Sequence, residues 1–203
     1  MLKTLRSGQA AMPFIMLVVL IDLVAIGLII PVLPAMVGQF AQSPAEQAYW
    51  YGVLAASFGV SSFLAAPLLG ALSDRYGRRP VLLLGFLGLG LSFFGTAAAS
   101  TLAALIAVRV VAGGMQANAA IANAYVADIT PPEERERRFG MLAPMTAVGF
   151  IVGPVAGGLL GAIRLELPFI VGGVLTVANF AYGYFVLPES LPIARQRTFR
   201  WAA

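Results

Sequence analysis

Two ionisable residues lie deep inside apolar stretches of the sequence. Asp22 is about nine residues into the first stretch, which corresponds to roughly 13 Å of helix at about 1.5 Å per residue. Arg109 is about seven residues into the fourth stretch. A charge at such a depth in hydrocarbon has to face a partner or a water-filled cavity, and such residues commonly bind protons or substrates. We therefore predict a proton or substrate site at Asp22 and Arg109; the alternative is a structural pair that fixes helix packing, and the sequence leaves open whether the two side chains touch.

Three amides follow Arg109 in the same stretch. Gln116 lies seven residues after Arg109 and Asn123 seven residues after Gln116, so these side chains share one face of a continuous helix. Asn118 lies between them. A polar face inside a membrane turns toward protein or water. Interhelical hydrogen bonding and a substrate-cavity wall are equally good interpretations of Gln116, Asn118 and Asn123.

The residue inventory excludes most enzyme chemistry. The sequence has no cysteine and no histidine, which removes thiol nucleophiles, Ser-His-Asp triads and the usual zinc sites. It also lacks HExxH, GxSxG and phosphate-loop motifs. We predict that the protein is not an enzyme and has no resident metal or organic cofactor.

The apolar composition requires a membrane as solvent. Of the 203 residues, 60% are hydrophobic and 11% are charged, whereas soluble domains average about 45–50% and about 25%. A membrane-spanning helix needs about 20 apolar residues, and no stretch shows the alternation of a barrel strand. We predict an all-α membrane protein with six spans, at residues 12–37, 48–72, 80–99, 102–125, 140–162 and 168–187.

Basic residues predict how these spans are oriented. They gather before the first span and after the second, fourth and sixth spans, at Lys3, Arg6, Arg75, Arg78, Arg79, Arg135, Arg137, Arg138, Arg195, Arg197 and Arg200. The alternate loops hold only Arg164. By the positive-inside rule, both termini are cytoplasmic. The basic excess is thus a topology signal with contact to anionic lipid, and no nucleic-acid partner is predicted.

The spans carry a faint internal repeat. Proline followed by small residues occurs at the same relative place in residues 64–72 and 152–162, and spans one and four each hold one charge. Two sets of three spans with opposite insertion are typical of secondary transporters. In the fifth span, the pattern predicts a face for close helix packing with a proline kink, formed by Gly149, Gly153, Pro154, Gly157 and Gly158.

Four motifs occur in the order typical of one family. Residues 70–80 resemble the signature loop Gly-x-x-x-Asp-Arg-x-Gly-Arg-Arg between helices two and three of the major facilitator superfamily. Asp22 with Gly27, Pro31 and Pro34 resembles the first-helix motif of its drug/proton antiporter branch. Residues 109–113 resemble the fourth-helix motif and residues 149–158 the fifth-helix antiporter motif. Residues 127–130 and 153–163 look most like bacterial tetracycline/proton antiporters.

The resemblance implies a transport function and a place for each motif. It implies the N-terminal half of a major facilitator fold with 3+3 inverted repeats, which exports an amphipathic, drug-like molecule such as a tetracycline in exchange for protons. Residues 1–190 would form the six-helix bundle in the inner membrane of a bacterium, and residues 191–203 would begin a central cytoplasmic loop. Asp22 would bind the proton and Arg109 would tune it. The cytoplasmic gate would consist of Gly70, Asp74, Arg75, Gly77, Arg78, Arg79 and Asp128.

Two features depart from this resemblance. Tetracycline exporters of this type carry an aspartate in the third helix, where this sequence has Ser92 and no charged residue in the whole span. This argues against specificity for a metal–tetracycline complex. The family has twelve helices in two halves, whereas this sequence has six spans. We therefore expect a second six-helix half as partner; the alternatives are a truncated fragment that does not transport and a homodimeric half-transporter.

Overall fold

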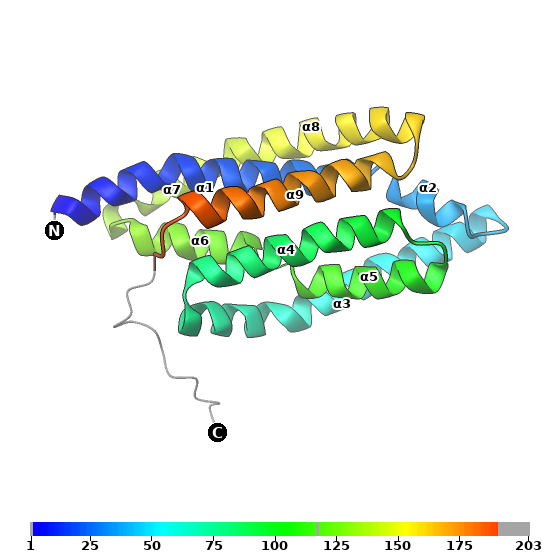
Figure 1. Ribbon diagram of the computed structural model, residues 1–203, viewed down its shortest axis with the longest axis horizontal. Coiled ribbons are helices and arrows are strands. Elements are labelled where there is room, and N and C mark those ends of the chain that lie inside the picture. Colours follow the sequence, from blue (N-terminus) through cyan, green and yellow to red (C-terminus); the bar gives the residue numbers. More distant parts are fainter. Residues whose placement is uncertain (1, 117, 191–203) are drawn as a thin grey trace, which may run out of the picture.

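The computed structural model describes the backbone of residues 2–116 and 118–190, with their side chains except at 2–11, 14 and 119. The predicted central loop at 191–203 lies outside these residues. The described chain forms helices and turns without a strand: α1 (Leu2–Ile29), α2 (Leu33–Gly38), α3 (Pro44–Tyr76), α4 (Arg78–Ala97), α5 (Leu102–Gly114), α6 (Asn118–Ile129), the 3₁₀ turn η1 (Pro132–Glu134), α7 (Arg135–Gly140), α8 (Leu142–Ile163) and α9 (Leu167–Val186). The long helices lie side by side in one elongated bundle (Figure 1). Five segments are long and apolar enough to cross a membrane, so the predicted all-α membrane fold is confirmed.

The first span is interrupted near its far end. Helix α1 ends at Ile29, residues 30–32 form a turn, and α2 continues the crossing to Gly38. Pro31 explains the turn, because proline has no N–H to donate and its ring clashes with the carbonyl four residues earlier. The predicted span 12–37 is therefore one crossing made of two helices.

The prediction of a continuous fourth helix over residues 102–125 is wrong. Helix α5 ends at Gly114, and the next helix, α6, starts at Asn118. Met115 caps α5, because its N–H donates to carbonyls of the last turn, including that of Val111 at 3.1 Å. Glycine is a weak helix former, and Gly113 and Gly114 lie at this end of α5. Both pieces are too short to cross a membrane alone, so together they make the fourth crossing.

Helix packing follows the predicted internal repeat. The most extensive contacts join α1 with α8, α3 with α5 and α4 with α9. These are the first with the fifth span, the second with the fourth, and the third with the sixth. If spans one, two and three exchange places with spans four, five and six, the pair of spans one and five becomes the pair of spans four and two, and the reverse. The pair of spans three and six stays the same pair. This is the relation expected of two inverted three-helix repeats.

Glycines allow α1 and α8 to touch along their backbones. A Cβ atom on Gly153 would lie 2.6 Å from the Gly27 Cα atom, and one on Gly149 would lie 2.6 Å from the Leu23 Cβ atom. Gly157 packs directly on the Leu28 backbone. Pro154 lies inside the same helix, and its Cδ atom would be 3.0 Å from a Cβ on Gly27. The glycine face predicted from the motif is thus formed, except that Gly158 has no neighbour within 4 Å of its Cβ position.

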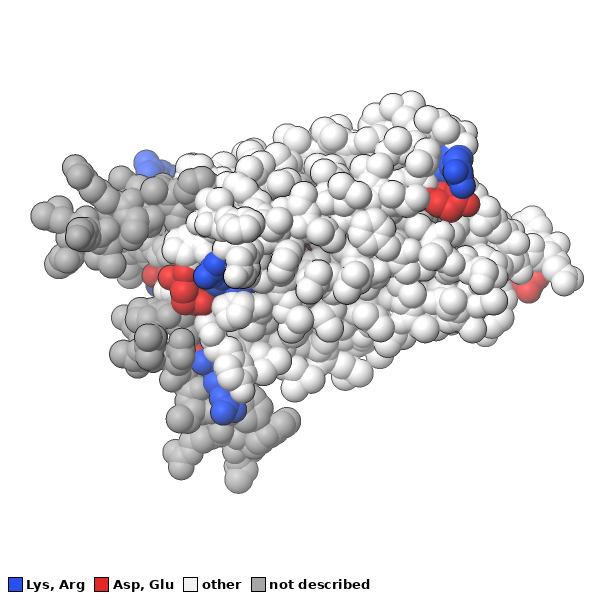
Figure 2. All heavy atoms as spheres, in the orientation of Figure 1, with Lys and Arg blue, Asp and Glu red and all other residues white. Residues whose placement is uncertain are grey.

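The exposed charged side chains lie at the ends of the bundle. On the face shown in Figure 2, blue and red atoms gather at the two ends and the flank between them is white. The turn between α3 and α4, the start of α1 and the end of α9 lie at the same end (Figure 1). Arg164 and Glu166, in the turn between α8 and α9, lie at the other end and form an exposed ion pair at 3.5 Å. An apolar flank with charged ends matches a hydrocarbon layer bounded by two polar interfaces.

Candidate functional site

Asp22 lines a small cavity inside the apolar part of the bundle. The cavity has a volume of about 180 Å³ and is lined by side chains from α1, α4, α6 and α8. Phe86, Asn118, Asn123 and Thr146 are among them. Asp22 itself is 6% exposed. No lysine or arginine is among the described residues that line this cavity, so the groups that face the carboxylate there are apolar or neutral.

The amide of Asn118 is the hydrogen-bonding partner of Asp22. Its Nδ2 atom donates to Asp22 Oδ1 at 3.4 Å, and its Oδ1 atom is buried without a donor. The amide fits because residue 85 of α4 is a glycine, since a Cβ on Gly85 would overlap the Asn118 oxygen. Asn118 is the first residue of α6, so the break in the fourth span positions this amide opposite α1. Sequence analysis named Asn118 but missed Gly85, whose role depends on a contact between two spans.

A second amide holds the turn of α1 that precedes Asp22. Asn179 of α9 is fully buried, and its Nδ2 atom donates to the Val18 carbonyl at 2.9 Å. In an α-helix the N–H of residue 22 points at that same carbonyl. Asn179 therefore attaches α9 to α1 one turn before the carboxylate. A lone asparagine in an apolar span is the signal that sequence analysis passed over.

Arg109 is buried separately from Asp22. It is 5% exposed, its Nη2 atom is 3.5 Å from the Thr96 hydroxyl, and its Nε atom has no hydrogen-bond partner. Among the described residues no ion pair joins Arg109 to Asp22. The question left open by the sequence is thus answered: each of these two charges lies in the apolar region without the other.

The three amides predicted to share a face are separated by the helix break. Gln116 lies in the connection between α5 and α6, and it does not line the Asp22 cavity. Asn118 and Asn123 do line it. The expected common face with Arg109 assumed an unbroken helix, and that assumption is wrong.

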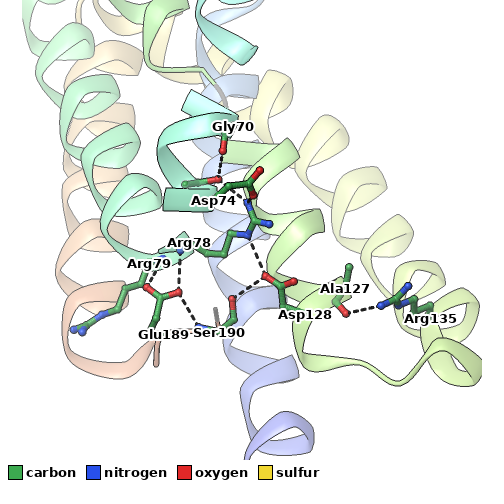
Figure 3. Close-up of polar contacts among 10 residues, drawn as sticks. Gly70, Asp74, Arg78, Arg79, Ala127, Asp128, Arg135, Glu189 and Ser190 are labelled. Atoms are coloured by element: carbon green, nitrogen blue, oxygen red, sulfur yellow. Dashed lines mark hydrogen bonds and ion pairs between the residues drawn. The ribbon is translucent and has the colours of Figure 1, made fainter. Parts of the chain in front are cut away.

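Arg78 is the centre of an ionic cluster at the turn between α3 and α4 (Figure 3). Its guanidinium pairs with Asp74 of α3 and with Asp128 Oδ2 of α6 at 3.0 Å, and its Nη1 atom donates to the Ser73 hydroxyl at 2.7 Å. The Arg78 side chain is 13% exposed. One arginine therefore connects two helices that belong to different three-helix repeats.

Glu189, which sequence analysis did not name, completes this cluster. Its two carboxylate oxygens accept N–H bonds from Arg78 at 2.9 Å and Arg79 at 3.2 Å, so it caps the first turn of α4. Gly77 makes the approach possible, because its φ is 104° and a side chain there would meet the carboxylate. The available signal was an acid directly after the sixth span. We call Ser73, Asp74, Arg78, Asp128 and Glu189 the Arg78 cluster.

The other predicted gate residues lie around the Arg78 cluster. Arg79 points away from Asp128 toward α9, where its guanidinium donates to the Tyr184 carbonyl and lies 5.5 Å from the Tyr184 ring (Figure 3). Arg75 is exposed, 5.1 Å from the Tyr76 ring. The Gly70 carbonyl accepts from the Ser73 hydroxyl at 2.9 Å. Of the three arginines in this loop, only Arg78 forms an ion pair among the described residues.

Ser92 occupies the position of the missing aspartate without replacing its charge. It is buried in α4, and its hydroxyl donates to the Gly88 carbonyl of the same helix at 2.8 Å. Its own carbonyl accepts from the Thr96 hydroxyl at 2.9 Å. The third span thus contains hydroxyl groups bonded to the helix backbone and no acid for a metal ion.

This combination of inverted three-helix repeats, buried lone charges and a terminal ionic cluster defines one half of a secondary membrane transporter. The family model described as Major Facilitator Superfamily matches residues 15–201. The chain belongs to that superfamily. Its members are transporters and not enzymes, and transporters of this type need no cofactor.

Similar proteins include bacterial and human members. The Escherichia coli protein "Tetracycline resistance protein, class C" is 44% identical over 194 residues, which cover 91% of this chain and 49% of that protein. The class H protein of Pasteurella multocida is 41% identical over 160 residues, 79% of this chain and 40% of that protein. The crystal structure of the human organic anion transporter MFSD10 (TETRAN) matches with a TM-score of 0.81 and 27% identity, over 93% of this chain and 49% of that one. The chain therefore spans about half the length of the relatives it matches.

Proposed function

We propose that the chain is the N-terminal half of a proton-coupled exporter of an amphipathic, drug-like molecule, with tetracycline-type compounds as candidates. The observation that carries this proposal is Asp22, a buried carboxylate that lines a cavity inside the spans and has no cationic partner among the side chains that the structure describes. Keeping an uncompensated charge in hydrocarbon costs about 2.5–3.5 kcal/mol at the centre of a helix. Such a cost is expected at a group that must gain and lose a proton. The similarity to tetracycline resistance proteins supports the same substrate class.

The Arg78 cluster has the role of a gate in this proposal. It fastens α3, α4, α6 and the segment after α9 at one end of the bundle, through ion pairs and hydrogen bonds that can break and form again. Rocking of this half against a second half would open the cavity to one side and then to the other. Proton transfer at Asp22, tuned by Arg109, would bias which side is open.

The orientation and location belong to the same proposal. Arginines concentrate at the end of the bundle where α1 starts and α9 ends, and the positive-inside rule makes this end cytoplasmic. Two of the similar proteins named above are bacterial resistance proteins, which supports the inner membrane of a bacterium.

Drug efflux from bacteria that express the full-length transporter tests the proposal. Asp22→Asn keeps the size and polarity of the side chain but cannot carry the proton. We expect efflux driven by the proton gradient to fall by at least about tenfold, as for loss of a group that takes part directly in a proton-transfer step. Glu133→Gln removes the same charge from an exposed position and is the matched control. Full efflux by the Asp22→Asn protein at equal expression contradicts the proposal.

This chain matches about half the length of its relatives, which supports the need for a second half. A second six-helix segment, on the same chain or on another, would complete the cavity. Co-expression of this chain with a matching second half should restore efflux that neither produces alone. Efflux by the chain alone, with a stable dimer in detergent, would instead support the homodimer. Failure to transport in either arrangement would identify a non-transporting fragment.

A further inference from the structure

We propose that Asp22 and its cavity bind the positively charged head group of the substrate, so that the exported molecules are organic cations. This inference rests on the proposed function and narrows its substrate class. The first observation that supports it is the negative charge of the cavity. Among the described residues that line it, Asp22 is the one titratable side chain, and the others are apolar or carry neutral amides and hydroxyls.

Asp22 lacks the arginine partner that four other acids of the described chain have. Asp74 and Asp128 pair with Arg78, Glu134 pairs with Arg138, and Glu166 pairs with Arg164. Asp22 is more deeply buried than these acids, and the Asn118 amide that donates to it at 3.4 Å is neutral. A buried carboxylate without an opposite charge attracts a cation more strongly than an exposed one does, because the local dielectric constant is low.

The size of the cavity fits a head group and not a whole drug. Its volume is about 180 Å³, whereas pockets that enclose drug-sized molecules measure about 300–1,000 Å³. A trimethylammonium or protonated amine group fits such a space beside Asp22. Phe86 adds an aromatic wall, and aromatic rings stabilise ammonium groups. The apolar remainder of the molecule would extend out of the cavity.

The opposite substrate charge is the main alternative. The human neighbour is named an organic anion transporter, and Arg109 is a buried cation without an acidic partner in the described chain. Arg109, however, does not line the Asp22 cavity. The cavity that contains an unpaired charge is negative, and we therefore favour cationic ligands.

Binding of three matched probes to the purified 203-residue chain in a non-ionic detergent tests this inference. Benzyltrimethylammonium is the cation, neopentylbenzene is its neutral isostere, and phenylmethanesulfonate is the anion. Calorimetry or the ligand-induced rise in unfolding temperature gives each affinity. We expect the cation to bind at least about tenfold more tightly than the other two, which corresponds to about 1.4 kcal/mol. Equal affinities for cation and neutral isostere, or tighter binding of the anion, overturn the inference.

Three variants locate the site. Asp22→Asn should reduce the preference for the cation to less than about twofold, and Glu133→Gln should leave it unchanged. Thr146→Phe keeps the carboxylate but fills the cavity from its half-buried rim, so it should weaken cation binding even if Asp22→Asn fails to fold. Cation binding that survives Thr146→Phe and Asp22→Asn places the ligand elsewhere and contradicts the inference.

The results separate this inference from the proposed function. If the chain does not prefer the cation but full-length efflux still depends on Asp22, the carboxylate serves protons alone and the substrate class is wrong. If the chain prefers the cation but the full-length protein shows no proton-driven efflux, the binding site stands and the transport proposal fails.

Discussion

Charges are compensated differently in the Arg78 cluster and at the two buried sites. Arg78 contacts two carboxylates and a hydroxyl, and the backbone of its helix end is capped by a third carboxylate. Asp22 and Arg109 each have one weak neutral partner, at 3.4 and 3.5 Å. The cluster is at the end of the bundle, where polar groups can also reach water, whereas Asp22 and Arg109 are inside the apolar spans.

This difference separates ionic groups that hold helices together from ionic groups that are buried without a counter-charge among the described residues. An ion pair at the end of a bundle stabilises a particular arrangement of helices. A lone charge in an apolar span lowers stability, which is the cost expected of the functional site that we propose at Asp22. The contrast predicts that substitutions in the two regions change stability in opposite directions.

The largest expected effect on stability comes from Arg78→Ala. It leaves Asp74 and Asp128 without their cation and Ser73 without its donor. Because these carboxylates are partly exposed, we expect the free energy of unfolding to fall by about 2 kcal/mol and not by the full value of a buried pair. Denaturation by sodium dodecyl sulfate, followed by circular dichroism, measures it. Arg75→Ala is the control, and an equal loss there would show that the cluster has no special role.

A smaller loss is expected for Glu189→Gln. The amide oxygen can still accept one N–H bond from α4, but the negative charge at the helix N-terminus is lost. The expected decrease is about 1 kcal/mol. The same denaturation assay, with Glu133→Gln beside it, measures this change. An unchanged stability would mean that the segment after α9 does not fasten α4.

Asp22→Asn should leave the stability unchanged or raise it by up to about 1 kcal/mol, because it removes a charge from an apolar span and keeps a polar side chain of the same size. The variant should therefore lose transport without losing its fold. Unfolding curves of the variant and the unchanged chain, measured side by side, test this. A loss as large as that of Arg78→Ala would mean that Asp22 is a structural group.

Salt should have the smallest effect and should act on one region only. Raising NaCl from 0.05 M to 1 M shortens the screening length from about 14 Å to about 3 Å. The unchanged chain should lose about 0.5 kcal/mol, because the Arg78 cluster is partly exposed. The Arg78→Ala chain should show no such loss in the same titration. Equal salt sensitivity of both chains would place the screened charges outside the cluster.

The class of fold and most element positions can be predicted from the residues alone. Long apolar runs without histidine or cysteine leave few alternatives to a helical membrane protein, since lipid forces each span to satisfy its own backbone hydrogen bonds. The glycine spacing in α8 predicted a packing face, and Gly149, Gly153 and Gly157 form it against α1. Local composition decides these features, so they can be read from the chain.

Which polar groups meet depends on how the helices pack. Asn118 reaches Asp22 because the fourth span breaks before it and Gly85 leaves space for its amide, and neither event follows from the seven-residue spacing. Glu189 reaches the start of α4 across more than a hundred residues of chain. Whether Asp22 and Arg109 pair was likewise undecided until the helices were placed. Pairing between distant residues depends on the packing of whole helices, and a local pattern contains no information about the partner on the other helix.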